Sequence, residues 1–306
     1  MIGHLRIKSP WSQLALFLGL MGGGFVLASL SMALVITSRG LPMAGLNQLD
    51  WSQPNVLSTM KLVQALSSII IFMLPALAFA LIVFRGRPFY FLGLRPPVKA
   101  PMYGLAMLCI LVSMPFVFWL GELNQLVNLP DWMVKLENET NRQMAQLLKA
   151  SGPADIAVNV LVIALLPALC EEICFRGVLQ RIIINICRNP WVGIIVTSAL
   201  FSALHLQFQG FLPRMFLGMI LGALYWYSGS LWTSILAHFI NNAVQVVAVS
   251  YAPQYMDKNP SMPLLAALAS GVLVMVILWV YRSFSTITYS KVYEYETLHS
   301  GNEFLA

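Results

Sequence analysis

Charged residues are scarce in this sequence. Only 10% of its 306 residues are Asp, Glu, Lys or Arg, whereas 58% are hydrophobic. A soluble domain usually carries about 25% charged residues, so this chain cannot cover a globule with side chains that water solvates. Lipid must cover part of the surface, and we therefore expect an all-α, polytopic membrane protein.

The sequence also lacks a redox motif and a nucleic-acid-binding pattern. Its four cysteines lie in or beside apolar stretches and form no CxxC pair, which is typical of small buried hydrophobic residues; they are Cys109, Cys170, Cys174 and Cys187. The net charge is +6, but Lys and Arg are scattered between apolar runs without a stripe of interleaved aromatics. We therefore read them as topology signals and expect no nucleic-acid partner.

Long apolar runs dominate the rest of the chain. A helix that crosses a bilayer needs about 20 mostly apolar residues. About eight runs meet this need; they lie near 11–37, 61–84, 101–127, 154–170, 190–206, 212–228, 231–250 and 262–281. The first run is too long for a signal peptide and no clean small-residue cleavage site follows it, so we expect it to be a span.

The connections between these runs indicate an orientation. If the N-terminus is cytoplasmic, the Lys and Arg count favours that side by eleven to seven, and both termini are then expected inside. The longest polar connection, 128–153, predicts an amphipathic helix lying on the membrane surface. Residues 171–188 predict a helix that runs from the membrane interior to the cytoplasmic interface. The absence of targeting segments is typical of a bacterial plasma-membrane protein.

Ionisable residues inside the spans gather in the second half of the chain. Each costs roughly 2.5–3.5 kcal/mol on insertion scales, so each suggests a function. The first group is Glu171-Glu172-x-x-x-Arg176. Glu172 and Arg176 share one helix face and can neutralise each other, whereas Glu171 points about 100° away and can face a cavity. The alternative is a buried ion pair that only fixes helix packing.

Two further groups have the same spacing. They are Phe201-x-x-x-His205 and His238-x-x-x-Asn242, and in each the two side chains share one helix face. A lone His on an apolar helix is more often a packing residue, and an Asn beside a His often bridges helices by hydrogen bonds. Neighbouring residues are less informative. The Gly218-x-x-x-Gly222 spacing predicts close helix packing. Gln207, Gln209 and Arg214 follow His205 and could touch a substrate, but they are more typical of solvated loop residues.

Together, and in this order on separate spans, the three groups resemble the signature of the CPBP family of intramembrane proteases. That family takes in the type II CAAX prenyl endopeptidases and the bacterial Abi proteins, and the resemblance covers about 155–250. It implies that Glu171 and His205 hold and deprotonate the attacking water, and that His238 and Asn242 polarise the scissile carbonyl. Glu172, Arg176 and Phe201 would be structural support. The implied division is 1–150 for N-terminal helices and loops, 151–285 for the catalytic helices, and 286–306 for a cytoplasmic tail.

The resemblance leaves the role of metal open. Glu171, His205 and His238 make a His₂Glu set, which is a familiar combination for catalytic zinc with one position free for water. Against zinc, these ligands come from separate helices without an HExxH motif, and Asn is a poor zinc ligand. The family is labelled a metalloprotease group, while a metal-free water mechanism is also proposed for it.

Other functions remain as alternatives. The chain lacks HExxH, GxSG and GxGD, so other intramembrane protease chemistries fit poorly. A proton-coupled transporter could use Glu171, Glu172 and His205 as a relay, but it predicts inverted repeats, and none is visible. A non-catalytic bacteriocin-immunity or scaffold protein would leave the polar groups dispensable. For a protease, the expected substrate is a peptide or lipidated protein that enters from the bilayer, such as a CAAX-like tail or a bacteriocin leader.

Overall fold

The computed structural model describes residues 5–42, 49–51, 53–252 and 261–294, and the segments of regular structure within these ranges are all helical. In chain order they are α1 (Pro10–Ser38), α2 (Pro54–Ser68), η2 (Ile69–Met73), α3 (Leu74–Val83), α4 (Pro88–Leu92), α5 (Pro101–Gln125), α6 (Asp131–Leu147), α7 (Pro153–Asn159), η3 (Val160–Leu165), α8 (Leu166–Glu172), η4 (Ile173–Gln180), α9 (Arg181–Cys187), α10 (Pro190–Ala203), η5 (Phe208–Gly210), α11 (Phe211–Ser228), α12 (Leu231–Tyr251), α13 (Leu264–Ser283) and η7 (Ser290–Glu294). The predicted all-α fold is confirmed.

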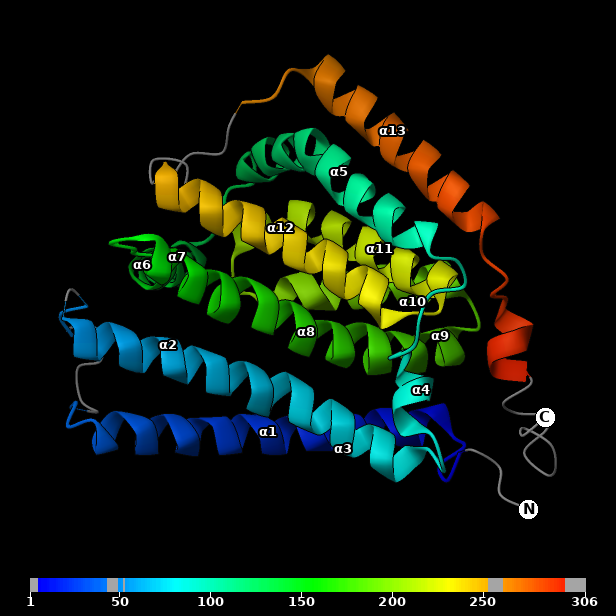
Figure 1. The fold of residues 1–306 in the computed structure, drawn as a ribbon, viewed down its shortest axis with the longest axis horizontal. Helices are drawn as coiled ribbons and strands as arrows, with labels where there is room; N and C mark the ends of the chain where they lie inside the picture. The colour runs from blue at the N-terminus through cyan, green and yellow to red at the C-terminus, as the bar shows by residue number, and fades with distance from the viewer. Residues whose placement is uncertain (1–4, 43–48, 52, 253–260, 295–306) are drawn as a thin grey trace.

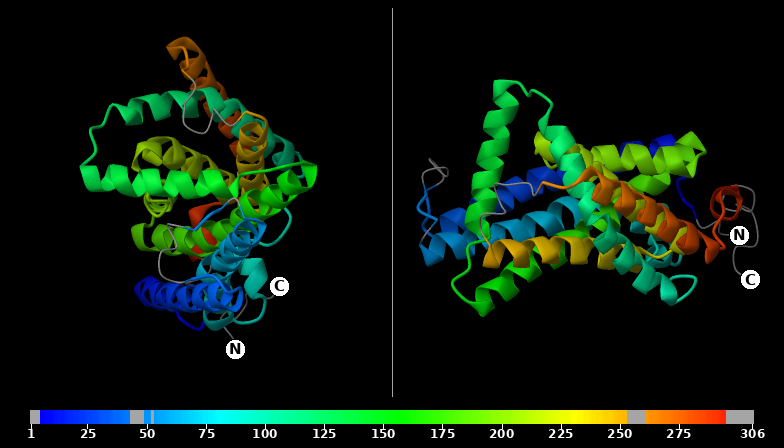
Figure 2. Two further views of the ribbon diagram at one scale, coloured as in Figure 1. Left: turned by 90° about the vertical axis from the view of Figure 1, so that its left-hand side faces the viewer. Right: turned by 90° about the horizontal axis from the view of Figure 1, so that it is seen from above.

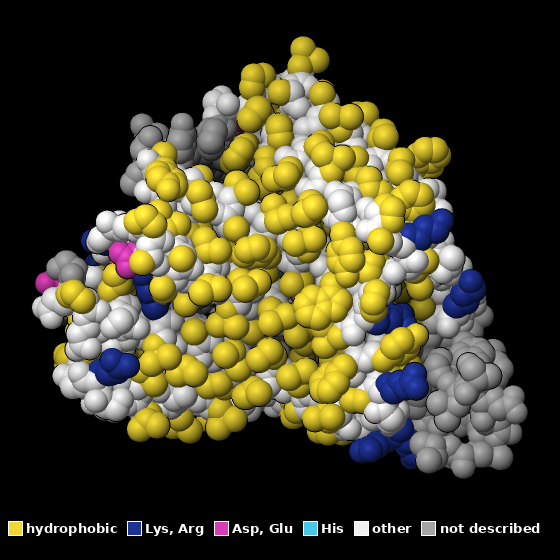
Figure 3. All heavy atoms as spheres, viewed as in Figure 1, with side chains coloured by type: hydrophobic (Ala, Val, Ile, Leu, Met, Phe, Trp, Pro, Cys, Tyr) yellow, Lys and Arg dark blue, Asp and Glu magenta, His cyan; other side chains and the backbone are white. Residues whose placement is uncertain are grey.

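Seven of these helical stretches are long and apolar enough to cross a membrane; they are Pro10–Ser38, Pro54–Val83, Pro101–Gln125, Pro153–Cys187, Phe208–Ser228, Leu231–Tyr251 and Leu264–Ser283. The remaining predicted span, 190–206, corresponds to α10, which is apolar but has only 14 residues. Figure 3 shows apolar side chains covering most of the visible face of the molecule. Since such a surface is stable in lipid and not in water, the chain is an integral membrane protein.

The span that carries the two adjacent glutamates is one continuous helix of 35 residues, Pro153–Cys187. It joins the run predicted at 154–170 to the helix predicted at 171–188. Its π-helical segment η3 ends directly before Leu166 and Pro167. Proline has no backbone N–H and its ring crowds the preceding turn, and a wider turn gives room for it. The same arrangement occurs in the second span, where η2 precedes Leu74–Pro75.

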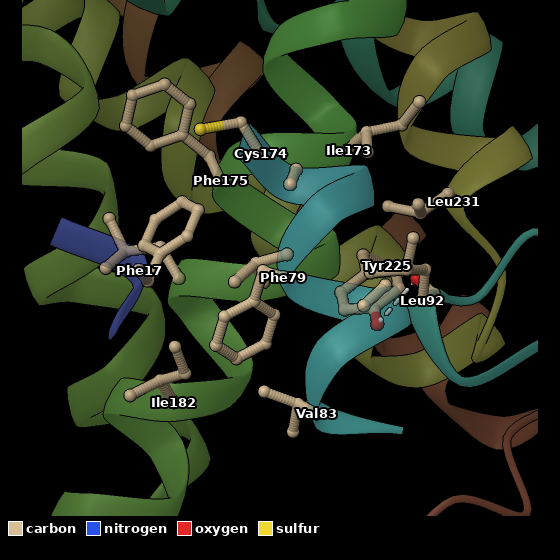
Figure 4. Packing of buried hydrophobic residues seen from close by; sticks show 14 of the residues in the cluster. Phe17, Phe79, Val83, Leu92, Ile173, Cys174, Phe175, Ile182, Tyr225 and Leu231 are labelled. Atoms are coloured by element: carbon tan, nitrogen blue, oxygen red, sulfur yellow. Dashed lines mark hydrogen bonds between the residues drawn. The ribbon is translucent and has the colours of Figure 1, made fainter. Parts of the chain in front are cut away.

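This continuous helix runs through the middle of the bundle. Figure 1 shows α8 between α2 and α12, and α8 contacts both of them. All eight residues of η4 are buried. Figure 4 shows its Ile173, Cys174 and Phe175 among aromatic and aliphatic side chains from α1, α3, α4, α9, α11 and α12. Burial from every side holds the middle of this helix in place.

Two glycines bring α11 close to its neighbours, as the Gly218-x-x-x-Gly222 spacing predicts. A Cβ on Gly218 would lie 2.9 Å from the Cβ of Ser198 on α10. A Cβ on Gly222 would lie 2.7 Å from Oε1 of Gln180 on η4. Real Cβ atoms do not approach so closely, so any side chain here would push the helices apart. The backbone carbonyls of α11 are thereby accessible to side chains from η4.

α6 differs from the other long helices in direction. It corresponds to the amphipathic helix predicted within 128–153, and Figure 2 shows it lying crosswise at one end of the bundle. At the opposite end α9 and α13 end and α5, α10 and α12 begin (Figure 1). Figure 3 shows Lys and Arg side chains gathered along that opposite edge. Of the predicted tail 286–306, residues 295–306 lie outside the described residues.

Candidate active site

The innermost part of the site is a fully buried ion pair. Arg176 Nη1 lies 3.0 Å from Glu172 Oε1, and neither side chain is accessible to solvent. Arg176 also donates from Nη2 to the carbonyl of Gly218 at 3.1 Å, which the absence of a side chain on that glycine permits. The guanidinium carbon lies 4.6 Å from the centre of the Phe201 ring, a cation–π distance. Predicted side-chain pairing within the first sequence group is therefore present.

Glu172 joins this ion pair to α12. His238 Nδ1 lies 2.9 Å from Glu172 Oε1, and both side chains are buried. An ionised carboxylate only accepts hydrogen bonds, so Nδ1 of this ring carries the proton and donates. The bond fixes the orientation of the imidazole and turns its other nitrogen, Nε2, toward Glu171, whose Oε2 lies 3.9 Å away. The first and third sequence groups thus meet in space.

Phe201 connects the second group to the other two. Its ring centre lies 4.8 Å from that of His205 and 5.8 Å from that of His238, both in edge-to-face geometry. His205 Nδ1 lies 2.8 Å from the carbonyl of Phe201. Because a carbonyl only accepts, Nδ1 carries the proton, and Nε2 of a neutral His205 is free to accept one. The aromatic ring thus separates the two imidazoles at a fixed spacing.

The two remaining predicted residues are more accessible. Glu171 and Asn242 are only partly buried, and Asn242 accepts a hydrogen bond through its Oδ1 from Asn241 at 3.1 Å. Buried oxygens of Glu171, Glu172 and Asn241 have no hydrogen-bond partner within the described structure. Buried polar atoms of this kind are usually satisfied by water, which is the co-substrate of hydrolysis.

Two residues that sequence reasoning placed elsewhere, or overlooked, border the site. Arg214 was read as a solvated loop residue, but it lies on α11, is partly buried, and interacts electrostatically with Glu171. Gln180 is fully buried and donates to the carbonyl of Gly222 at 3.1 Å. Its signal was the four-residue spacing that continues from Glu172 and Arg176 along the same helix.

The predicted zinc set does not gather into a metal-binding group. Across the described ranges, no three His, Cys, Asp or Glu side chains are arranged to hold a metal ion. Nδ1 of His205 and Nδ1 of His238 are both engaged by oxygen acceptors, so each ring could offer only Nε2. A metal requirement of this site therefore stays a prediction.

The fold and the site together define a class of protein. It is a polytopic α-helical membrane protein with a buried cluster of Glu, Arg and His side chains from separate helices. Residues 153–244 match the family model described as type II CAAX prenyl endopeptidase Rce1-like. The match contains all seven predicted site residues and confirms the resemblance predicted from the three groups. This segment is therefore similar to the CAAX-type endopeptidase family.

Two curated bacterial proteins are similar to about a third of the chain. "Uncharacterized protein YpbD" of Bacillus subtilis is 30% identical over 105 residues, which cover 33% of this chain and 51% of that protein. "Uncharacterized 24.3 kDa protein" of Escherichia coli is 33% identical over 99 residues, which cover 31% of this chain and 46% of that protein. The chain thus spans about half the length of the curated relatives it matches. No solved structure matches the chain significantly.

Proposed function

We propose that this protein is an intramembrane endopeptidase that hydrolyses a peptide bond with a water activated by Glu171 and His205. The arrangement around His238 carries the proposal. A buried carboxylate, Glu172, orients this ring from one side, while a second and less buried carboxylate, Glu171, faces its Nε2. A structural ion pair needs only the first carboxylate. The carboxyl group of Glu171 is therefore available as a general base.

In the proposed reaction, Glu171 takes a proton from water, and the hydroxide oxygen bonds to the carbonyl carbon of the substrate. The free Nε2 of His205 supports this step as a hydrogen-bond acceptor. The carbonyl oxygen becomes an oxyanion. For this step His238 is an imidazolium: its Nδ1–H stays on Glu172, and its Nε2–H donates to the oxyanion together with the amide N–H of Asn242. Glu171 then returns the proton to the leaving nitrogen as the C–N bond breaks. Water and peptide are thereby converted into a carboxylic acid and an amine.

The surroundings of the site support a substrate that is itself membrane-associated. The site lies on apolar helices, among them two candidate membrane spans, Pro153–Cys187 and Leu231–Tyr251, so a peptide with a lipid group or an apolar segment could approach through the bilayer. We therefore propose a lipid-modified or membrane-embedded peptide as the substrate class. A plasma-membrane location in a bacterium, with both termini cytoplasmic, is part of the same proposal.

The decisive experiment is Glu171→Gln, assayed with a fluorogenic lipidated peptide in liposomes. We expect cleavage to fall by about 10²–10⁴-fold, the usual contribution of a general base. Folding should stay close to that of the parent protein because the two side chains have the same shape. Glu139→Gln, a change at a partly exposed position of α6, is the matched control and should keep full activity. Full activity of Glu171→Gln would refute the proposed base.

A separate experiment addresses the predicted zinc. The purified protein is dialysed against a chelator and assayed before and after zinc is restored, with bound zinc measured by mass spectrometry. If Glu171, His205 and His238 act without metal, cleavage should be unaffected and no stoichiometric zinc should be detected. Loss of cleavage that zinc restores would instead assign these three residues as ligands, since metal affinity depends on such deprotonated groups.

A further inference from the structure

The loop that follows His205 is attached to the crosswise helix α6. Gln207 Nε2 donates to Asn141 Oδ1 at 2.6 Å, and the backbone N–H of Gln209 donates to Glu137 Oε2 at 3.1 Å. The rings of Trp132 and Phe208 also meet edge to face, 5.9 Å apart. Three residues of α6 therefore hold the loop that follows His205, although α6 contains none of the predicted site residues.

The same loop is fixed from the end of α5. Buried Asn124 donates from Nδ2 to the carbonyl of Phe208 at 2.9 Å and accepts at Oδ1 from the N–H of Leu212 at 2.7 Å. Both ends of one amide therefore bind backbone, one at the first residue of η5 and the other just after it, on α11. A buried amide used in this way has its hydrogen-bonding groups satisfied only when the loop keeps this conformation.

The backbone immediately after His205 requires such support. Leu206 has a φ of 55°, in the left-handed region that residues with a Cβ rarely adopt. A strained residue of this kind persists only where the surrounding structure determines its conformation. The attachments to α5 and α6 begin at the next residue, Gln207. They therefore fix the backbone that places the His205 ring against Phe201.

Gln207 also extends the attachment to the other side of the site. While its amide nitrogen donates to Asn141, its Oε1 accepts from Arg214 Nη2 at 2.6 Å. Arg214 in turn interacts electrostatically with Glu171. A displacement of α6 would thus change the surroundings of His205 and of Glu171 together.

We propose that Glu137 and Asn141 of α6 are positioning residues of the hydrolytic site, acting through the 204–210 loop on His205. This inference rests on the proposed protease function. α6 is amphipathic and lies crosswise at one end of the spans, as a membrane-surface helix does. The site is therefore ordered only when this helix is seated on the loop.

The first test measures loop order and needs no activity. Glu137→Ala and Asn141→Ala are compared with Glu137→Gln and Asn141→Asp, which keep an acceptor oxygen, and with Glu139→Ala, whose side chain pairs with Arg142 within α6. We expect amide hydrogen exchange across 204–210 to be about tenfold faster in the first pair and unchanged in the others. Asn141 is exposed, so its variants should fold. Unchanged exchange in Glu137→Ala and Asn141→Ala would overturn the proposal.

The second test measures cleavage by the same variants. The two alanine variants should lose about tenfold in kcat with little change in KM, and the two conservative variants should recover it, because the His205 ring is displaced but the substrate surface is kept. A parent protein that cleaves nothing would refute the protease function, while the exchange data would still decide whether α6 orders the loop. Faster exchange with full kcat in the alanine variants would refute positioning alone.

Discussion

One carboxylate oxygen of Glu172 serves two buried partners. Oε1 lies 3.0 Å from Arg176 Nη1 and 2.9 Å from His238 Nδ1. Removal of one member of a buried ion pair leaves an uncompensated charge and costs about 3–5 kcal/mol, whereas replacement of both by apolar residues of similar volume is often neutral. In this protein, an apolar replacement of Glu172 would also remove the acceptor that orients the His238 imidazole.

Because Glu172 serves both partners, we expect a variant that lacks both Glu172 and Arg176 to be stable but unable to cleave. Arg176→Met alone should lower the free energy of unfolding by about 3–5 kcal/mol, measured by thermal unfolding in detergent. The double variant Glu172→Leu with Arg176→Met should recover much of that stability, yet it should remain unable to cleave because His238 has lost its acceptor. A double variant that is stable and active would show that Glu172 does not orient His238.

At the level of single helices, sequence periodicity predicted most of what is observed. Apolar run length predicted the seven spans and one helix, α10, that is too short to count among them. The four-residue spacing of Glu172 with Arg176 and of Phe201 with His205 predicted their shared faces. Such spacing depends only on local helix geometry. The contact of His238 with Glu172 joins residues 66 positions apart, and no local pattern predicts which of two adjacent glutamates an imidazole will meet.

Of the three residues predicted to be solvated in the loop, only Arg214 was assigned wrongly, because it lies on α11 and is partly buried. Gln207 and Gln209 do lie between α10 and α11, and Gln209 is exposed. Their hydrogen-bond partners are nevertheless on α6, which the sequence identified only as an amphipathic surface helix. The apolar pattern of α6 indicates that it lies at the membrane surface, but not which loop its polar face covers. The π-turns before Pro75 and Pro167 likewise follow from proline sterics only once the helices are known to continue.

At the scale of the whole molecule, the acidic side chains outside the site gather at one end of the bundle, whereas basic side chains occur at both ends. Basic residues adjoin the helix termini where α9 and α13 end; they include Arg85, Arg87, Arg95, Lys99, Arg188 and Arg282. Outside the buried site, the acidic side chains that the structure describes adjoin the opposite ends of the helices; they are Asp50, Glu122, Asp131, Glu137, Glu139 and Asp155. Because cytoplasmic loops are enriched in Lys and Arg, this distribution favours the predicted orientation.

The chain carries a natural probe for that orientation. Cys187 is exposed at the basic end, whereas Cys109, Cys170 and Cys174 are buried. A membrane-impermeant maleimide should therefore leave intact bacterial cells that express the protein unlabelled and should label Cys187 once the cells are permeabilised. Cys187→Ser is the control for background, and Glu139→Cys in that variant should label from outside, because α6 lies at the opposite end of the bundle. Labelling of Cys187 in intact cells would place the basic end, and with it both termini, on the outer side, contrary to the rule that cytoplasmic loops are the positively charged ones.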